Sequence, residues 1–161
     1  MQKLCISLMV SILLIATLSS AYCPSYPDVK QEFVESELVF VGKVISEEKV
    51  HASSNGYFDG INYTISVIET LRGKPGQVVI VFSENSSGRF PMETDETYLV
   101  FTSLTPGTFA DVPVYTISYC GNSGKVQQKK NALSLARKLS KSLSSKNLKS
   151  DGLQSPTSRH H

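Results

Sequence analysis

Tryptophan is absent from the 161 residues of this chain, and only 19% of them are charged. That charge is too low for a chain disordered throughout, and 40% hydrophobic residues can build one core. The length is typical of one domain and argues against several. The sequence also lacks a glycine-rich phosphate loop, a nucleophile elbow and a His/Cys/Asp/Glu cluster with structural zinc spacing. We therefore expect no enzyme, no cofactor and no metal site of its own.

The charges that are present divide the chain into an acidic part and a basic tail. Residues 1–124 carry 7 basic and 13 acidic side chains, a net charge of −6. Residues 125–161 carry 9 basic side chains and one acid, Asp151, a net charge of +8. No aromatic residues alternate with the basic ones in this tail. Nucleic-acid binding is therefore not expected.

Residues 1–21 have the pattern of a secretory signal peptide. Lys3 precedes a mostly apolar run over residues 6–18, and the small residues Ser19-Ser20-Ala21 follow. The apolar run is shorter than the roughly 20 residues that a membrane-spanning helix needs. Cleavage fits after Ser20 or after Ala21, and the small residues favour the second site. We expect a protein that is secreted or exported to the periplasm.

Export changes how the three cysteines are interpreted. Cys5 would leave with the signal peptide, so the mature chain would keep Cys23 and Cys120. In an oxidising compartment, two cysteines at opposite ends of a domain most simply form one disulfide. The alternative is a thiolate nucleophile, which needs a nearby histidine, and only His51 lies in the part expected to fold. We predict the bridge, which would stabilise the fold by roughly 4–5 kcal/mol in the chain-entropy model.

Hydrophobic patterning predicts one short helix followed by five strands. The apolar residues of segment 29–36 have helical spacing. Strands are predicted where β-branched or alternating apolar residues lie between turn residues, over 38–45, 61–71, 78–82, 97–103 and 114–119. Gly42 is expected at a bulge or bend. The class predicted from this pattern is an all-β barrel or sandwich.

The basic tail begins with a predicted amphipathic helix over residues 131–143. Its leucines recur one turn apart, and its basic residues lie elsewhere on the helix. From Ser144 onward Ser, Lys, Asn and Gly dominate, so disorder is expected. The segment 125–150 either packs on the barrel or binds an anionic membrane or a polyanion through its basic face.

Other polar groups have simpler interpretations. Glu93, Asp95 and Glu96 form the densest acidic group, which we interpret as a solvated corner rather than a calcium or general-acid site. Asn62 and Asn85 each begin an N-glycosylation acceptor pattern. These two patterns matter only if the source is eukaryotic.

The order of features along the chain also points to a family. A signal peptide ends just before a cysteine, two prolines follow, and a short helix leads into Leu38-Val39-Phe40-Val41-Gly42-Lys43-Val44. Later Tyr98-Leu99-Val100-Phe101 follows an acidic turn, and the last predicted strand leads to Cys120. This order resembles the netrin-like domain of tissue inhibitors of metalloproteinases, most closely the compact exported relatives of bacteria. The resemblance covers residues 22–124 and implies a five-stranded OB-type barrel.

The resemblance also implies a mode of inhibition. In family inhibitors a Cys-x-Cys begins the mature chain, and the α-amine and carbonyl of its first cysteine chelate the catalytic zinc of the target protease. Here Cys23 matches the second cysteine, and its bridge to Cys120 matches the family. Ala21 stands in place of the first cysteine. The usual partner of that cysteine lies in the loop that reads Ser83–Arg89 here, which contains no cysteine, so one bridge is absent as a complete pair.

The function implied by the resemblance is an exported, non-enzymatic inhibitor of zinc metalloproteases that acts through Ala21, Tyr22 and Cys23. Chelation uses backbone atoms, so Ala21 can provide it if cleavage falls after Ser20, and Tyr22 would then fill the specificity pocket. Cleavage after Ala21 instead places the disulfide-bonded Cys23 where the probing side chain should be. The alternative is a netrin-like binding module of the envelope or extracellular space that inhibits no protease.

Overall fold

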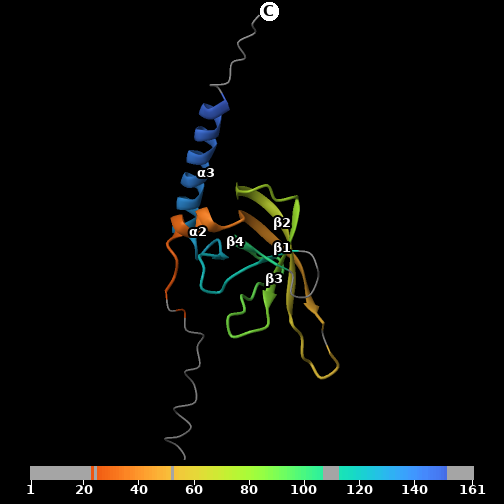
Figure 1. Cartoon of the computed structure of the whole chain (residues 1–161). Helices are drawn as coiled ribbons and strands as arrows, with labels where there is room; N and C mark the ends of the chain where they lie inside the picture. The colour runs from red at the N-terminus through yellow and green to blue at the C-terminus, as the bar shows by residue number, and fades with distance from the viewer. Residues whose placement is uncertain (1–22, 24, 52, 107–112, 152–161) are drawn as a thin grey trace, which may run out of the picture.

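The computed structural model describes Cys23 and residues 25–51, 53–106 and 113–151, with side chains as far as Ser145 (Figure 1). The predicted signal peptide, Ala21 and Tyr22 lie outside these residues. The chain is mostly β, as predicted, with one sheet of six strands and two helices in its described part. Neither of these two helices is long and apolar enough to cross a membrane.

The five predicted strands form where the pattern placed them, with changed ends. They are β1 (Leu38–Val50), β2 (Gly60–Arg72), β3 (Val78–Glu84), β4 (Thr97–Thr105) and β5 (Val114–Thr116). A sixth strand, β6 (Gly124–Lys125), was not predicted. β1 continues past its predicted end at Ile45, because its exposed, polar second half pairs with the start of β2. β5 ends before the predicted Tyr119, where the chain turns toward Cys120. β6 has only two residues, too few for a period-2 pattern.

The first five strands pair in a continuous series in which β1 pairs with both β2 and β4. The order is β1-β2-β3-β5-β4-β6, and β1 also pairs with β4. β3 and β5 are parallel, whereas the other pairs are antiparallel. β1 therefore has neighbours on both sides over residues 39–43. This arrangement gives the sheet an interior face and an exterior face.

Bulges between β1 and β2 bend these strands. The ladder leaves Ile45 of β1 and Ile68 and Leu71 of β2 without a cross-strand partner. Such extra residues bend a strand and increase its twist. Gly42 lies at one of these irregularities, as predicted, and a Cβ there would stand 2.5 Å from Cγ2 of Ile65. A glycine at this position therefore permits the close approach of the two strands.

Alternating residues of β1 and β4 contribute to two separate cores. The interior core includes Phe40 and Val100, whereas Val39 and Phe101 belong to an outer core. Both faces are buried here, which explains why β1 begins with a nearly continuous apolar run. The outer core is completed by helix residues, above all Phe33, Leu133 and Ala136.

The helices α2 (Val29–Glu35) and α3 (Lys130–Asp151) lie side by side on this outer core (Figure 1). α3 begins one residue before its predicted start and ends at Asp151, beyond its predicted end at Leu143. Its first turns are held by buried Leu133 and Ala136, and an already nucleated helix propagates easily through residues such as Ser and Lys. The end of α3 extends past the sheet (Figure 1).

Candidate functional site: the anchored amino-terminal segment

A disulfide joins the start of the described chain to the segment after β5. Cys23 and Cys120 are bonded with an Sγ–Sγ distance of 2.01 Å and a Cα–Cα distance of 5.5 Å. The predicted bridge is therefore present. Both sulfurs are committed to it, and His51 instead contacts Asp59, with 2.7 Å between Nδ1 and Oδ2. Among the described residues these contacts leave no thiolate for the nucleophile alternative.

A carboxylate–amide network holds the same two segments together a few residues further on. Oε2 of Glu32 accepts hydrogen bonds from the backbone N–H of Asn122 at 2.7 Å and from its Nδ2 at 2.6 Å. The same Nδ2 donates to the carbonyl of Pro27 at 2.9 Å. Gly121 keeps the space for this contact open, because a Cβ there would collide with Oε1 of Glu32. The chain that follows Cys23 is thus fixed against residues 120–122 by both covalent and polar contacts.

Helix α2 connects this anchored segment to the sheet. Asp28 caps its first turn by accepting from the N–H of Lys30 at 3.1 Å. Phe33 is 1% exposed in the outer core, and the guanidinium of Arg72 lies 5.9 Å from its ring centroid. Nε of Arg72 also donates to the carbonyl of Ser36 at 2.8 Å. The amino-terminal segment is therefore continuous with packed structure rather than attached by a free linker.

Exposed aromatic side chains flank the disulfide. Tyr26 is 63% exposed and lies three residues after Cys23, and Tyr119 is 42% exposed and precedes Cys120. Tyrosine combines a large apolar ring with a polar tip and is enriched at protein–protein interfaces. This chemistry suits contact with another protein around the anchored segment.

The acidic group before β4 is paired with lysines. Nζ of Lys125 lies 2.9 Å from Glu93 and 3.4 Å from Glu96, and Lys43 lies 2.8 Å from Asp95. The hydrogen bond to Glu93 raises the pKa of Lys125. Across the described ranges, no group of three or more His, Cys, Asp or Glu side chains could hold a metal ion. This corner therefore contains ion pairs at a largely exposed surface.

The two glycosylation patterns lie in different surroundings. Asn62 is half-buried in β2 and pairs in register with Glu48 and Phe82. Asn85 follows β3, where its Nδ2 donates to the carbonyl of Phe58 at 2.9 Å. The side chain of Asn85 therefore already holds the β3–β4 loop to the β1–β2 turn.

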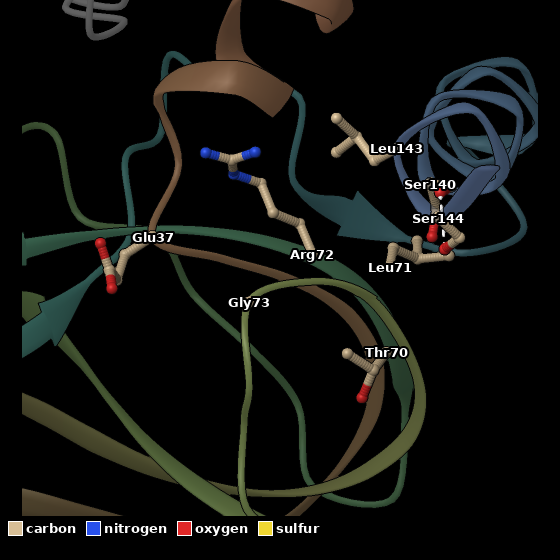
Figure 2. Close-up of a pocket in the computed structure, with 8 residues that line it drawn as sticks. All are labelled: Glu37, Thr70, Leu71, Arg72, Gly73, Ser140, Leu143 and Ser144. Atoms are coloured by element: carbon tan, nitrogen blue, oxygen red, sulfur yellow. Dashed lines mark hydrogen bonds between the residues drawn. The ribbon is translucent and has the colours of Figure 1, made fainter. Parts of the chain in front are cut away.

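A groove of about 530 Å³ opens between the end of β2 and α3 (Figure 2). Its lining includes Thr70, Arg72 and Gly73 from the strand end and Ser140, Leu143 and Ser144 from the helix. Figure 2 shows the guanidinium of Arg72 turned toward α2 and the side chain of Glu37 directed away from α3. The Ser144 hydroxyl donates to the Ser140 carbonyl of its own helix at 3.2 Å. Since these polar groups do not converge, the groove is a weak candidate for a ligand site.

Comparison with protein-family models gives no match for this chain, and comparison with curated proteins gives none either. The candidate site therefore rests on its own geometry. The structure brings together Cys23 and Cys120, which the sequence predicted, whereas Ala21 and Tyr22 lie outside the described residues. Sequence reasoning missed the pairing of Glu32 with Asn122. These residues are 90 positions apart, and no local pattern marks either of them.

Proposed function

We propose that this chain is an exported inhibitor of zinc metalloproteases that acts through its mature amino terminus. The observation that carries the proposal is the double anchoring of the first described residues by the Cys23–Cys120 bridge and the Asn122–Glu32 contact. Only Tyr22 separates Ala21 from the bridged Cys23. An inhibitory residue held so near a fixed point loses less conformational entropy on binding than one on a free chain.

The strand order supports assignment of the sheet to the OB type found in netrin-like domains. An OB fold is a five-stranded, partly open Greek-key barrel. The first three strands pair in succession, β1 also pairs with β4, and β3 pairs in parallel with β5. The short helix and the bridge at the two ends of this unit agree with the family resemblance. Because one fold carries many functions, the anchored terminus, and not the fold, supports the inhibitory role.

We call Ala21, Tyr22 and Cys23 the inhibitory wedge. Its chemistry uses the backbone of Ala21 and therefore requires signal cleavage after Ser20, not after Ala21. The free α-amine and the carbonyl of Ala21 would together form a five-membered chelate on the zinc of the protease, which keeps one coordination position open. Tyr22 would enter the specificity pocket, and Cys23 would fix the direction of both. The amine must be deprotonated, and α-amines ordinarily have a pKa near 7.7–8.0. Inhibition should therefore strengthen as the pH rises through that range.

Two proteins with defined first residues test the proposal. One begins at Ala21 and the other at Tyr22, and both are prepared with the disulfide formed. Each is titrated against a panel of zinc metalloendopeptidases with a fluorogenic peptide substrate. We expect inhibition by the Ala21 protein, loss of inhibition after acetylation of its α-amine, and none by the Tyr22 protein.

The same experiment can contradict the wedge. Inhibition that survives acetylation, or that is equal for the two first residues, would show that the amine does not bind the zinc. Folded, oxidised Ala21 protein that inhibits no protease of the panel would favour the non-inhibitory binding module. Mass analysis of the exported protein from its native host gives the first residue directly, and a start at Tyr22 would argue against the wedge.

A further inference from the structure

One side of α3 carries lysines that line a groove of about 500 Å³. Lys130, Lys138 and Lys141, here called the basic face, are all exposed. Val126 and Leu133 contribute apolar surface to the same groove. At 3.6 residues per turn, the spacings of eight and three residues place the three lysines on one side of the helix. The basic face is thus a row of positive charges beside a groove.

The charges of the basic face are not neutralised within the described residues. Arg137, which also lines the groove, makes a two-pronged contact with Glu69, with Nη2–Oε2 at 2.7 Å and Nε–Oε1 at 3.0 Å. Lys125 is paired with Glu93 and with Glu96. By contrast, none of the ion pairs found among the described side chains includes a lysine of the basic face. These lysines remain available to an anionic partner.

The apolar side of the first turns of α3 is already used by the fold. Leu133 is 5% exposed and Ala136 is 0% exposed, and both pack in the outer core with Leu139 beside them. A helix that lies in a bilayer interface must insert its apolar face among the lipids. α3 cannot do so while that face covers the sheet. The packing therefore argues against membrane insertion and leaves electrostatic contact through the basic face.

We propose that the basic face binds a linear anionic polysaccharide that carries sulfate or carboxylate groups. From Lys130 to Lys141 the helix rises about 16 Å, which matches a row of charges along a polymer better than a single phosphate group. An ammonium group binds anions as a point charge without fixed geometry, so a repeating polymer can occupy the groove in several registers. The net charge of +8 on residues 125–161 attracts such a chain from a distance.

Nucleic acid is the other linear polyanion to consider. Proteins that bind single strands without sequence preference combine basic grooves with aromatic residues on which bases stack. No aromatic residue occurs in segment 125–161. This composition favours a saccharide chain, whose recognition does not depend on base stacking. The proposal is independent of the protease inhibitor assignment, because it uses none of residues 21–23.

Two charge-matched triple variants of the full oxidised chain test the proposal, with heparin as the probe. The first combines Lys130→Gln, Lys138→Gln and Lys141→Gln, and the second combines Lys30→Gln, Lys49→Gln and Lys74→Gln. Both lower the net charge equally, and glutamine preserves helix propensity in the first. Affinity is measured by calorimetry at several salt concentrations. We expect the first variant to lose at least about tenfold in affinity and the second to lose no more than about twofold.

Several outcomes would overturn the proposal. Equal losses in both variants would show that only net charge matters. Vesicles containing anionic phospholipid that bind as tightly as heparin, through the same three lysines, would assign the face to membranes. Duplex DNA that competes as well as heparin would assign it to nucleic acid. Circular dichroism and urea unfolding show whether each variant remains folded, and a wild-type protein that does not bind heparin ends the proposal.

Discussion

Asn122 is the residue on which the polar half of the amino-terminal anchor depends. Its backbone N–H and side-chain amide both reach the Glu32 carboxylate, and the same amide reaches the carbonyl of Pro27. One side chain therefore joins α2, the segment ahead of it and the loop after β5. A carboxylate that accepts such bonds is fixed in direction, and this also fixes the first turn of α2.

Replacing Asn122→Ala should reduce the free energy of unfolding by about 2–3 kcal/mol, because hydrogen bonds to charged groups contribute about 1.5–3 kcal/mol. Glu32→Gln is the matched control. It retains an oxygen acceptor of the same length, so its expected loss is below about 1.5 kcal/mol. Urea unfolding of the oxidised protein measures both. If Asn122→Ala unfolds at the same urea concentration as the wild type, the network does not contribute to the anchor.

Tyr98 gives the fold a dependence on alkaline pH. Burial raises the pKa of Tyr98, whose hydroxyl also accepts a hydrogen bond from the N–H of Glu93 at 2.9 Å. The folded state therefore retains the phenol proton to a higher pH than the unfolded state. The resulting stabilisation is fully present below about pH 10, the ordinary pKa of tyrosine, and is lost as the pH rises through the folded pKa. The raised pKa of Lys125 acts in the same direction.

We expect the free energy of unfolding to decline above about pH 10, where both groups begin to lose protons. Tyr98→Phe removes the phenol but leaves Lys125, so its decline should be shallower than that of the wild type without disappearing. Urea unfolding between about pH 8 and pH 11 measures the two slopes. Equal slopes for the two proteins would show that Tyr98 does not titrate differently on folding.

At the scale of elements, α3 is part of the fold and not a removable appendage. Leu133 and Ala136 share the outer core with Phe33 of α2, and Arg137 binds Glu69 of β2. Deleting residues 125–161 would therefore remove a wall of the outer core together with the basic face. Point substitutions separate these two roles, whereas truncation does not.

Two leucine substitutions in α3 test its packing. Leu133 is 5% exposed, so Leu133→Ala should reduce the free energy of unfolding by about 2–5 kcal/mol. Leu135 is 36% exposed, and Leu135→Ala should change it by about 0.5 kcal/mol or less. The two changes are chemically identical, so thermal unfolding compares burial alone. Equal effects would mean that α3 does not pack on the sheet in solution.

The sequence predicted elements whose burial imposes a pattern. In β2 the buried residues Ile61, Tyr63 and Ile65 alternate with half-buried polar ones, which is the signal that placed the strand. The polar second half of β1 and the two residues of β6 lack such alternation, so the extents of these strands could not be predicted. The last turns of α3 lack an apolar pattern as well, since they continue a helix nucleated elsewhere.

In the candidate site, too, the sequence predicted only the residues that a sequence pattern marks. Cysteines are few, so the pairing of Cys23 with Cys120 followed from the number left after signal cleavage. Asn122 and Glu32 are common residue types separated by 90 positions, and nothing local distinguishes them from other surface residues. The same holds for Arg137 and Glu69, which are 68 positions apart. Only the tertiary fold brings such pairs together.

At the scale of the whole molecule, the disulfide links stability to the proposed function. It joins residues 97 positions apart, and the chain-entropy model assigns about 4–5 kcal/mol to a loop of that size. The Asn122–Glu32 network holds the same two segments without it, so the chain after Pro27 should stay near the loop when the bridge is lost. The position of residues nearer the amino terminus would then depend on the Asn122–Glu32 network, which lies further along the chain from them than the bridge does.

The double variant Cys23→Ser/Cys120→Ser separates the two effects of the bridge. Its free energy of unfolding should fall by up to about 4–5 kcal/mol in urea, as should that of the reduced wild type. Below the temperature at which it unfolds, it should also inhibit a sensitive metalloprotease more weakly, because the wedge is less preorganised. Asn122→Ala should show a smaller loss of inhibition, since the covalent attachment remains. Inhibition that is undiminished in the folded double variant would show that the Cys23–Cys120 bridge does not position the amino terminus.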